Sequence, residues 1–349
     1  MKTRIVLLIL IVFASAVGAQ EGPLPDGPLA CAEIVVPTAD QGREYSFKMS
    51  LSPDGETLAV LRTEHSRILF YSTMTDRLVD SLDPGLDRSF GLAWSPDGNQ
   101  IAVSGEIDDT HSIPLSYDIV IWDLETKREA ARQTNALATS VAWSPTAPLI
   151  ALASRIDSAV IWDFERDTVT QIGREAEVLA WKPDGSALVG SWETSYGWIW
   201  YEETDRLVVS PQRYSFDALA WSPDGRFLAL SSSTVGQYVY DVVEHPDTLF
   251  SLDASVFHFV DAPVSSLAWS PIDNYLAAAS RWGLVLWDVQ AGFEATTFFY
   301  TGNTPPFAGN IPAFVDVAWM PDGETLLALS DSGTIYTWDI PCLVALDQN

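Results

Sequence analysis

Histidines and clustered carboxylates are the side chains of this chain best suited to chemistry. The four histidines lie far apart, and none belongs to a His-Glu-x-x-His arrangement, which would place two zinc ligands on one helix face. One short stretch combines Asp108, Asp109 and His111, which are all residue types that bind metal ions. An acidic pair beside one histidine is common by chance in so acidic a chain, so we expect no bound metal and no other cofactor.

Motifs of nucleophilic and phosphate-binding sites are also missing from the sequence. There is no Gly-x-Ser-x-Gly turn to expose a serine nucleophile, no glycine-rich phosphate loop and no Cys-x-x-Cys pair. Paired carboxylates are abundant and therefore give no sign of general acid-base catalysis. The sequence predicts a protein that is not an enzyme.

A repeat supplies the elements that must position these residues. The pattern apolar, small, Trp, Ser, Pro, Asp, Gly returns seven times, in full or with substitutions, at intervals of 38 to 50 residues, with its prolines at Pro53, Pro96, Pro145, Pro183, Pro223, Pro271 and Pro321. This interval is typical of a four-stranded propeller blade. Proline presets the first corner of a turn, aspartate bonds the backbone ahead and glycine accepts a positive φ. Each copy therefore predicts a hairpin between a first and a second strand.

Third strands are predicted to end on an aromatic residue, usually followed by aspartate. The strongest examples are Trp122-Asp123, Trp162-Asp163, Trp287-Asp288 and Trp338-Asp339, and weaker ones are Tyr240-Asp241, Trp200-Tyr201 and Tyr71-Ser72. Candidate fourth strands are residues 77–82, 168–172, 206–210, 248–252 and 295–300.

At these residues the chain resembles the WD-repeat family of β-propellers, over residues 45–340. Its Ser-Pro-Asp-Gly turns are also similar to those of periplasmic Tol-type propellers. The resemblance implies an all-β fold, a seven-bladed β-propeller of four-stranded antiparallel blades that closes by pairing its N- and C-terminal segments. No Gly-His dipeptide precedes a first strand, so the Asp-His-Ser-Trp hydrogen-bond network of many WD repeats is not implied here.

Three tryptophans fall outside the repeated first-strand and third-strand positions. Trp198 stands two residues before Trp200, hence on the same strand face, and is predicted to pack between blades. Trp192 and Trp282 lie near hairpins that join second and third strands. The sequence leaves two roles open for them, contact with a partner at the surface and packing within the fold.

The first residues have the composition of a secretory signal. Lys2 and Arg4 precede an apolar run over residues 5–17, and small residues follow at 17–19. We expect a signal peptide over 1–19, an N-terminal extension over 20–32, a single propeller domain over 33–349, and a secreted or periplasmic product that does not insert into a membrane. An uncleaved anchor and lipidation at Cys31 are the alternatives.

Export would make the two cysteines informative, because an oxidising compartment permits a disulfide. In a propeller closed by its N-terminus, residues 33–37 would be the outer strand of the last blade, which would place Cys31 near Cys342 and predict a disulfide between them. Two buried free thiols are the alternative. A competing closure would use residues 342–346 as the outer strand.

The formal net charge of −28 excludes some partner classes. Nucleic acids and anionic membrane surfaces attract clustered Lys and Arg, which this chain lacks. A basic protein, a cationic ligand or divalent ions would fit such a surface better, and strong acidity also serves solubility. We expect a monomer.

Binding is expected at loops on the face opposite the Pro-Asp-Gly turns, because loops on a rigid scaffold carry function. Irregular insertions there are predicted at residues 106–116, 256–263 and 301–312. The candidate partner-binding residues are His65, Asp108, Asp109, His111, Arg155, Trp192, Tyr196, Arg281, Trp282 and Phe307. The resemblance and the absence of catalytic motifs imply a non-catalytic interaction scaffold, and the signal sequence predicts that it is exported. The alternatives are a Tol-like accessory propeller and a metal-dependent enzyme with its site in the central channel.

Overall fold

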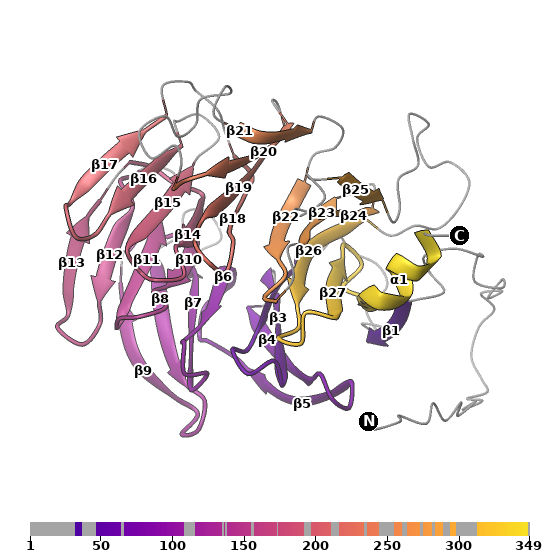
Figure 1. Cartoon of the computed structure of the whole chain (residues 1–349). Coiled ribbons are helices and arrows are strands. Elements are labelled where there is room, and N and C mark those ends of the chain that lie inside the picture. Colours follow the sequence, from indigo (N-terminus) through magenta and orange to yellow (C-terminus); the bar gives the residue numbers. More distant parts are fainter. Residues whose placement is uncertain are drawn as a thin grey trace.

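The protein is a closed ring of seven four-stranded antiparallel sheets (Figure 1). The computed structural model describes residues 32–36, 47–63, 66–107, 116–134, 136, 138–154, 157–172, 174–191, 197–210, 216–233, 236–243, 255–259, 264–272, 275–280, 283–288, 294–297 and 313–347. The innermost strands contact one another in the order β2, β6, β10, β14, β18, β22 and β26, and β26 contacts β2 again. The predicted seven-bladed propeller is confirmed.

The first four blades follow one another along the chain. Blade 1 contains β2 (Phe47–Leu51), β3 (Thr57–Arg62), β4 (Arg67–Ser72) and β5 (Arg77–Leu82). Blade 2 contains β6 (Arg88–Trp94), β7 (Gln100–Ile107), β8 (Ser116–Asp123) and β9 (Arg128–Gln133). Blade 3 contains β10 (Ser140–Trp143), β11 (Leu149–Ala153), β12 (Val160–Asp163) and β13 (Thr168–Gln171), and blade 4 contains β14 (Val178–Trp181), β15 (Ala187–Ser191), β16 (Trp198–Tyr201) and β17 (Arg206–Val209).

Blades 5 to 7 complete the ring. Blade 5 contains β18 (Ala218–Trp221), β19 (Phe227–Ser232), β20 (Gly236–Asp241) and β21 (Ser255–Phe259), and blade 6 contains β22 (Val264–Trp269), β23 (Tyr275–Ser280), β24 (Gly283–Asp288) and β25 (Glu294–Thr297). Blade 7 contains β26 (Phe314–Trp319), β27 (Thr325–Ser330), β28 (Ile335–Asp339) and, as its outer strand, β1 (Ala32–Val36).

The ring closes through β1, as the predicted N-terminal closure requires. β1 runs antiparallel to β28, and Ala32 lies opposite Trp338. The competing closure by residues 342–346 is wrong, because these residues belong to the helix α1 (Ile340–Asp347). Pro341 has no N–H to give to a strand ladder, and Asp339 accepts a 2.8 Å hydrogen bond from the N–H of Cys342, which starts the helix instead.

Two predicted outer strands differ from the observed ones. The outer strand of blade 5 is β21 at Ser255–Phe259, so the prediction of residues 248–252 as that strand is wrong, and part of the predicted insertion at 256–263 is a strand. Both stretches are apolar and similar in length, and only pairing with β20 chooses between them. Residues 106, 107 and 116, predicted as insertion, extend β7 and β8. The predicted strand at 295–300 corresponds to β25 at Glu294–Thr297, and residues 298–300 lie outside the described residues.

Burial explains the sequence of the second strands. Each blade packs on both faces, so β11 and β15 are almost entirely buried and read as apolar runs rather than as alternating patterns. Outer strands such as β5 and β13 are exposed along almost their whole length and carry polar residues. Burial therefore separates the inner strands from the rim.

Seven hydrophobic cores hold the ring together, one between each pair of neighbouring blades. Trp198 is fully buried in the core between blades 3 and 4, and its indole Nε1 donates a 3.2 Å hydrogen bond to the carbonyl oxygen of Glu175. Gly190 makes room for it, because a Cβ at Gly190 would lie 2.3 Å from the indole ring. The predicted packing role of Trp198 is confirmed.

In the part of the chain that the structure describes, no helix is both long and apolar enough to cross a bilayer. The predicted signal peptide at 1–19 lies outside the described residues.

Candidate functional site

The ring has two faces that differ in regularity. We call the turn face the end of the blades where first strands join second strands, and the loop face the opposite end, where second strands join third strands and each blade joins the next. Every first-to-second connection has five residues, whereas the second-to-third connections range from two residues in blade 6 to eight in blade 2. The first-to-second connections are therefore constant in length, whereas the second-to-third connections are not.

The carboxylates of the turn face are held by their own turns. Asp54 accepts hydrogen bonds from the Ser52 hydroxyl at 2.6 Å and from the N–H of Glu56 at 3.0 Å, and the Ser52 hydroxyl oxygen accepts the N–H of Thr57 at 2.9 Å. Both hydrogen bonds to the carboxylate lower the pKa of Asp54, and the bond from the Ser52 hydroxyl has the larger effect. The turns at Ser95 and Ser222 repeat this geometry. Serine and aspartate thus build the turn.

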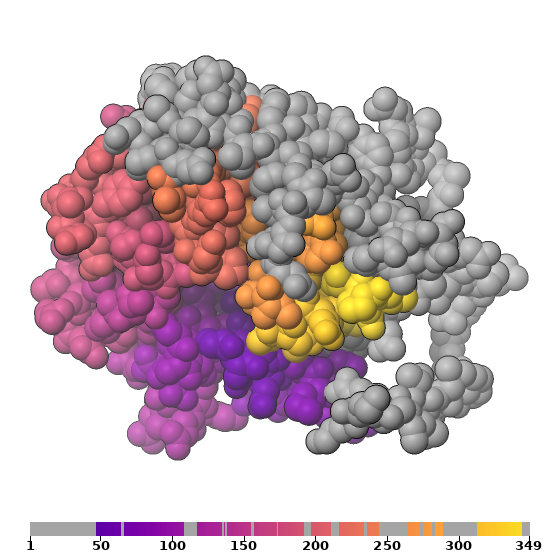
Figure 2. Space-filling model, viewed as in Figure 1, coloured from indigo at the N-terminus to yellow at the C-terminus, as the bar shows by residue number. Residues whose placement is uncertain are grey.

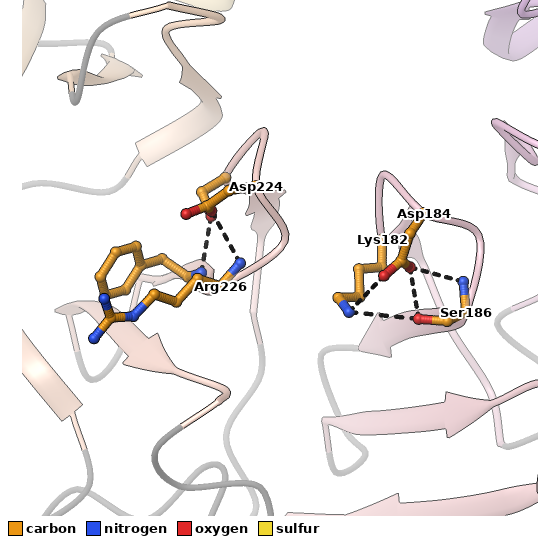
Figure 3. Close-up of polar contacts among 7 residues, drawn as sticks. Lys182, Asp184, Ser186, Asp224 and Arg226 are labelled. Carbon is orange, nitrogen blue, oxygen red and sulfur yellow. Dashed lines mark hydrogen bonds and ion pairs between the residues drawn. The ribbon is translucent and has the colours of Figure 1, made fainter.

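Blade 4 replaces the serine with Lys182 (Figure 3). The Lys182 ammonium lies 2.8 Å from Asp184 Oδ2, while Ser186 donates both its hydroxyl and its N–H to Asp184 Oδ1. Burial would raise the pKa of Asp184, but the hydrogen bonds from Lys182 and Ser186 outweigh it and lower the pKa to about 2. This carboxylate therefore stays charged and stabilises its turn.

The aspartates after the third strands cap the next turn. Asp123 Oδ1 accepts the hydroxyl and the N–H of Thr126 at 2.6 and 2.7 Å, and Asp163 accepts the N–H of Arg166 at 2.9 Å. Asp339 makes the same bond, three residues ahead, to Cys342. One residue type thus caps a hairpin in blades 2 and 3 and a helix in blade 7.

On the loop face, blade 2 contains buried acids that sequence reasoning missed. Arg88 contacts Glu106 at 3.3 Å, and Arg132 contacts both Asp118 at 3.0 Å and Glu129 at 2.7 Å. The bond to Glu129, and to a lesser extent that to Asp118, raises the pKa of Arg132 against its partial burial. The sequence does contain acidic residues and arginines on neighbouring strands of blade 2, but which of them pair depends on the register between the strands. These pairs fix the ends of β7 and β8.

Asp316 joins three blades and was also missed. Its Oδ1 accepts the Ser266 hydroxyl of blade 6 at 2.7 Å, and its Oδ2 accepts the N–H of Met49 of blade 1 at 3.0 Å. A charged residue on an innermost strand thus supports the closure of the ring.

All ten residues predicted to bind a partner lie outside the residues that the structure describes: His65, Asp108, Asp109, His111, Arg155, Trp192, Tyr196, Arg281, Trp282 and Phe307. The structure does place the strands that flank them. The first nine fall in second-to-third connections and Phe307 falls between β25 and β26, so every flanking strand end belongs to the loop face. Within the described ranges, no three His, Cys, Asp or Glu side chains are grouped to hold a metal ion.

A groove opens where the last blade meets the first. We call this interface the seam; Figure 2 shows the indigo surface of blade 1 beside the yellow surface of blade 7. The seam groove encloses about 290 Å³, and its apolar lining comes from Leu58, Tyr71, Met74, Met320, Leu327 and Ile335. The sequence did not predict this groove, although it gave Tyr71-Ser72 as one of the weaker third-strand ends.

The comparison with protein families supports the repeat. The family described as WD domain, G-beta repeat, matches residues 251–288 and 307–339, which include β22 to β24 and β26 to β28. No curated protein matches the chain. The two matching repeats are part of a closed ring of seven four-stranded blades, so the chain is a seven-bladed β-propeller whose sixth and seventh blades match the WD40 repeat.

Proposed function

We propose that this propeller is an exported, non-catalytic scaffold that binds a protein partner through its loop face. The observation that carries the proposal is the contrast between the two faces. On the turn face, all seven first-to-second connections have five residues, and the third-to-fourth connections have four or five residues except for thirteen in blade 5. On the loop face, the connections vary from two to eight residues within blades and from four to sixteen between blades. Rigid scaffolds commonly carry binding residues on such variable connections.

A non-catalytic role is supported by what the polar residues of the turn face do. Asp54, Asp97, Asp184 and Asp224 each accept hydrogen bonds from their own turn. These carboxylates are used to shape the backbone. The propeller fold itself is host to many functions, so the proposal depends on the surface rather than on the fold alone.

The expected partner is a protein with a basic surface, because the chain carries a net charge of −28. The ten candidate residues named above belong to this proposed surface, with aromatic and arginine side chains as its anchors. The propeller would act as a monomer outside the cytosol.

Export also supports a disulfide between Cys31 and Cys342, which we include in the proposal. Cys31 directly precedes β1, and β1 begins opposite Trp338, four residues before Cys342. A bridge between them would hold the closing strand against blade 7 in an oxidising compartment.

The test is affinity capture from the envelope and medium of the exporting cell with two double variants. Trp192→Ala with Trp282→Ala removes two candidate anchors from the loop face. Val243→Ala with Ile272→Ala is the matched control, because both are exposed apolar residues of the turn face, 69% and 63% exposed. We expect a specific partner to be lost by the first pair and retained by the second. Equal recovery of every partner by wild type and both variants would refute the loop-face site.

A further inference from the structure

The seam is the one interface among the described residues whose core contains no tryptophan. Each of the other six cores includes at least one indole, either buried or packed against it. The seam core instead combines Phe47, Met49, Tyr71 and aliphatic residues. Leu51 stands where six blades have the first-strand tryptophan, and Tyr71 stands where five blades have the third-strand tryptophan.

Tyr71 lines the seam groove at the position where five other blades have a tryptophan. In blades 3 and 4 the indoles of Trp162 and Trp200 donate to Asp167 and Asp205, five residues further along, at 3.4 and 2.9 Å. In blade 1, Asp76 likewise comes five residues after Tyr71 in the sequence, and both residues line the groove. The groove thus lies beside the position that a larger aromatic side chain occupies elsewhere in the ring.

The groove presents an unusual set of surface groups. Met74 of blade 1 is 78% exposed, and Met320 of blade 7 also lines the groove, so each of the two blades contributes one flexible methionine. Methionine side chains adapt to apolar partners of different shape. Tyr71 is only 7% exposed, and no hydrogen bond to its hydroxyl is found among the residues that the structure describes.

The charge of the groove is of one sign. Asp76 of blade 1 and Asp322 of blade 7 are both exposed and line it, and none of the described lining residues is basic. Asp322 Oδ1 accepts hydrogen bonds from the N–H groups of Glu324 and Thr325 at 2.9 and 3.0 Å. A cation next to an apolar group would complement such a site.

The volume limits the occupant. About 290 Å³ lies just below the roughly 300 to 1,000 Å³ of pockets that hold drug-sized ligands. It suits one large side chain of a peptide better than a complete cofactor.

We infer that the seam groove is a second docking site, which binds a peptide segment of a partner protein through one bulky apolar side chain flanked by lysine or arginine. It lies on the turn face, at the Pro-Asp-Gly turn of blade 7, and so is distinct from the loop-face site; it rests on the proposed function only in that the protein binds partners.

The test uses a random dodecapeptide library displayed on phage. Peptides are selected on wild-type protein after depletion on Tyr71→Trp, which restores the residue of five other blades and fills the groove. We expect the selected peptides to share a large apolar residue next to a basic one. If no peptide survives depletion, or if the survivors lack basic residues, the inference is wrong.

Binding of one selected peptide, labelled with fluorescein, is then measured by anisotropy. We expect binding about tenfold weaker with Met74→Ser, since a truncated anchor contact commonly has that effect, and several-fold weaker with Asp322→Asn. Val243→Ser and Asp224→Asn are the matched controls, because they make the same changes elsewhere on the turn face and should leave binding unchanged. Circular dichroism melting confirms that each variant is folded.

Two outcomes separate this inference from the proposed function. The double variant Trp192→Ala with Trp282→Ala should bind the peptide as wild type does, whatever its effect on partner capture. Unchanged peptide binding by Met74→Ser and Asp322→Asn would overturn the seam site and leave the loop-face proposal standing.

Discussion

The indole Nε1 of Trp319 donates a 3.0 Å hydrogen bond to the carbonyl oxygen of Ala268 in the preceding blade. The same bond, at 3.0 to 3.2 Å, links Trp94 to Ser50, Trp181 to Ala142, Trp221 to Ala180 and Trp269 to Ala220. The acceptor is always the small residue just before the first-strand tryptophan position. A small side chain lets the next blade's indole lie against the strand and reach its carbonyl, which explains why the repeat reads small-Trp.

Trp319→Phe tests this bond, because phenylalanine keeps an aromatic ring and removes the donor. We expect a loss of about 1 to 2 kcal/mol in the free energy of unfolding, mainly from the unpaired carbonyl. Urea unfolding followed by fluorescence measures it. Trp143→Phe is the control, since Trp143 occupies the same position without a hydrogen-bond partner among the described residues. Equal losses in the two variants would contradict the role of the bond.

Contacts between neighbouring turns predict a difference between two glycines. Gly55 and Gly98 both have positive φ, +75° and +73°, but a Cβ at Gly55 would lie 2.4 Å from Pro321, whereas one at Gly98 would lie 3.7 Å from Pro53. Gly98→Ala should therefore cost only the strain of a left-handed alanine, roughly 1 to 2 kcal/mol. Gly55→Ala should cost more, because the rigid proline ring of blade 7 must move. Thermal unfolding of both variants checks the order, and a smaller loss for Gly55→Ala would contradict it.

The lowered pKa of Asp184 predicts how stability depends on acid. Because the folded pKa of about 2 lies below the ordinary value of roughly 4, this carboxylate stabilises the fold above about pH 4. That contribution is lost as the pH falls from about 4 to 2. Asp184→Asn should flatten this part of a urea-midpoint against pH profile, and Lys182→Met should do so in part. Parallel profiles for wild type and Asp184→Asn would show that this aspartate is not responsible.

The proposed Cys31–Cys342 bridge predicts sensitivity to reduction. Under an oxidising buffer, intact mass should increase on reduction, and the reductant should lower the free energy of unfolding by about 2 to 4 kcal/mol. The double variant Cys31→Ser with Cys342→Ser should have the lower stability in both buffers. A wild type whose mass and stability are unchanged by reductant contains two free thiols instead.

The sequence by itself determined the number and order of the blades. The observed first strands end at the tryptophan positions and the observed third strands end at the aromatic-Asp positions, as predicted. Such features are local: each five-residue turn is shaped by the proline and polar residues within it, and the spacing of the repeats gives the number of blades.

Tertiary structure alone decided which segments meet. The choice of β21 over residues 248–252, the formation of α1 at Ile340–Asp347, and the three-blade contacts of Asp316 depend on partners far away in the sequence. The seam groove depends on blades 1 and 7, whose lining residues lie at opposite ends of the chain and meet only when β1 closes the ring. Local patterns specify each blade, but contacts between distant segments exist only after the blades have packed.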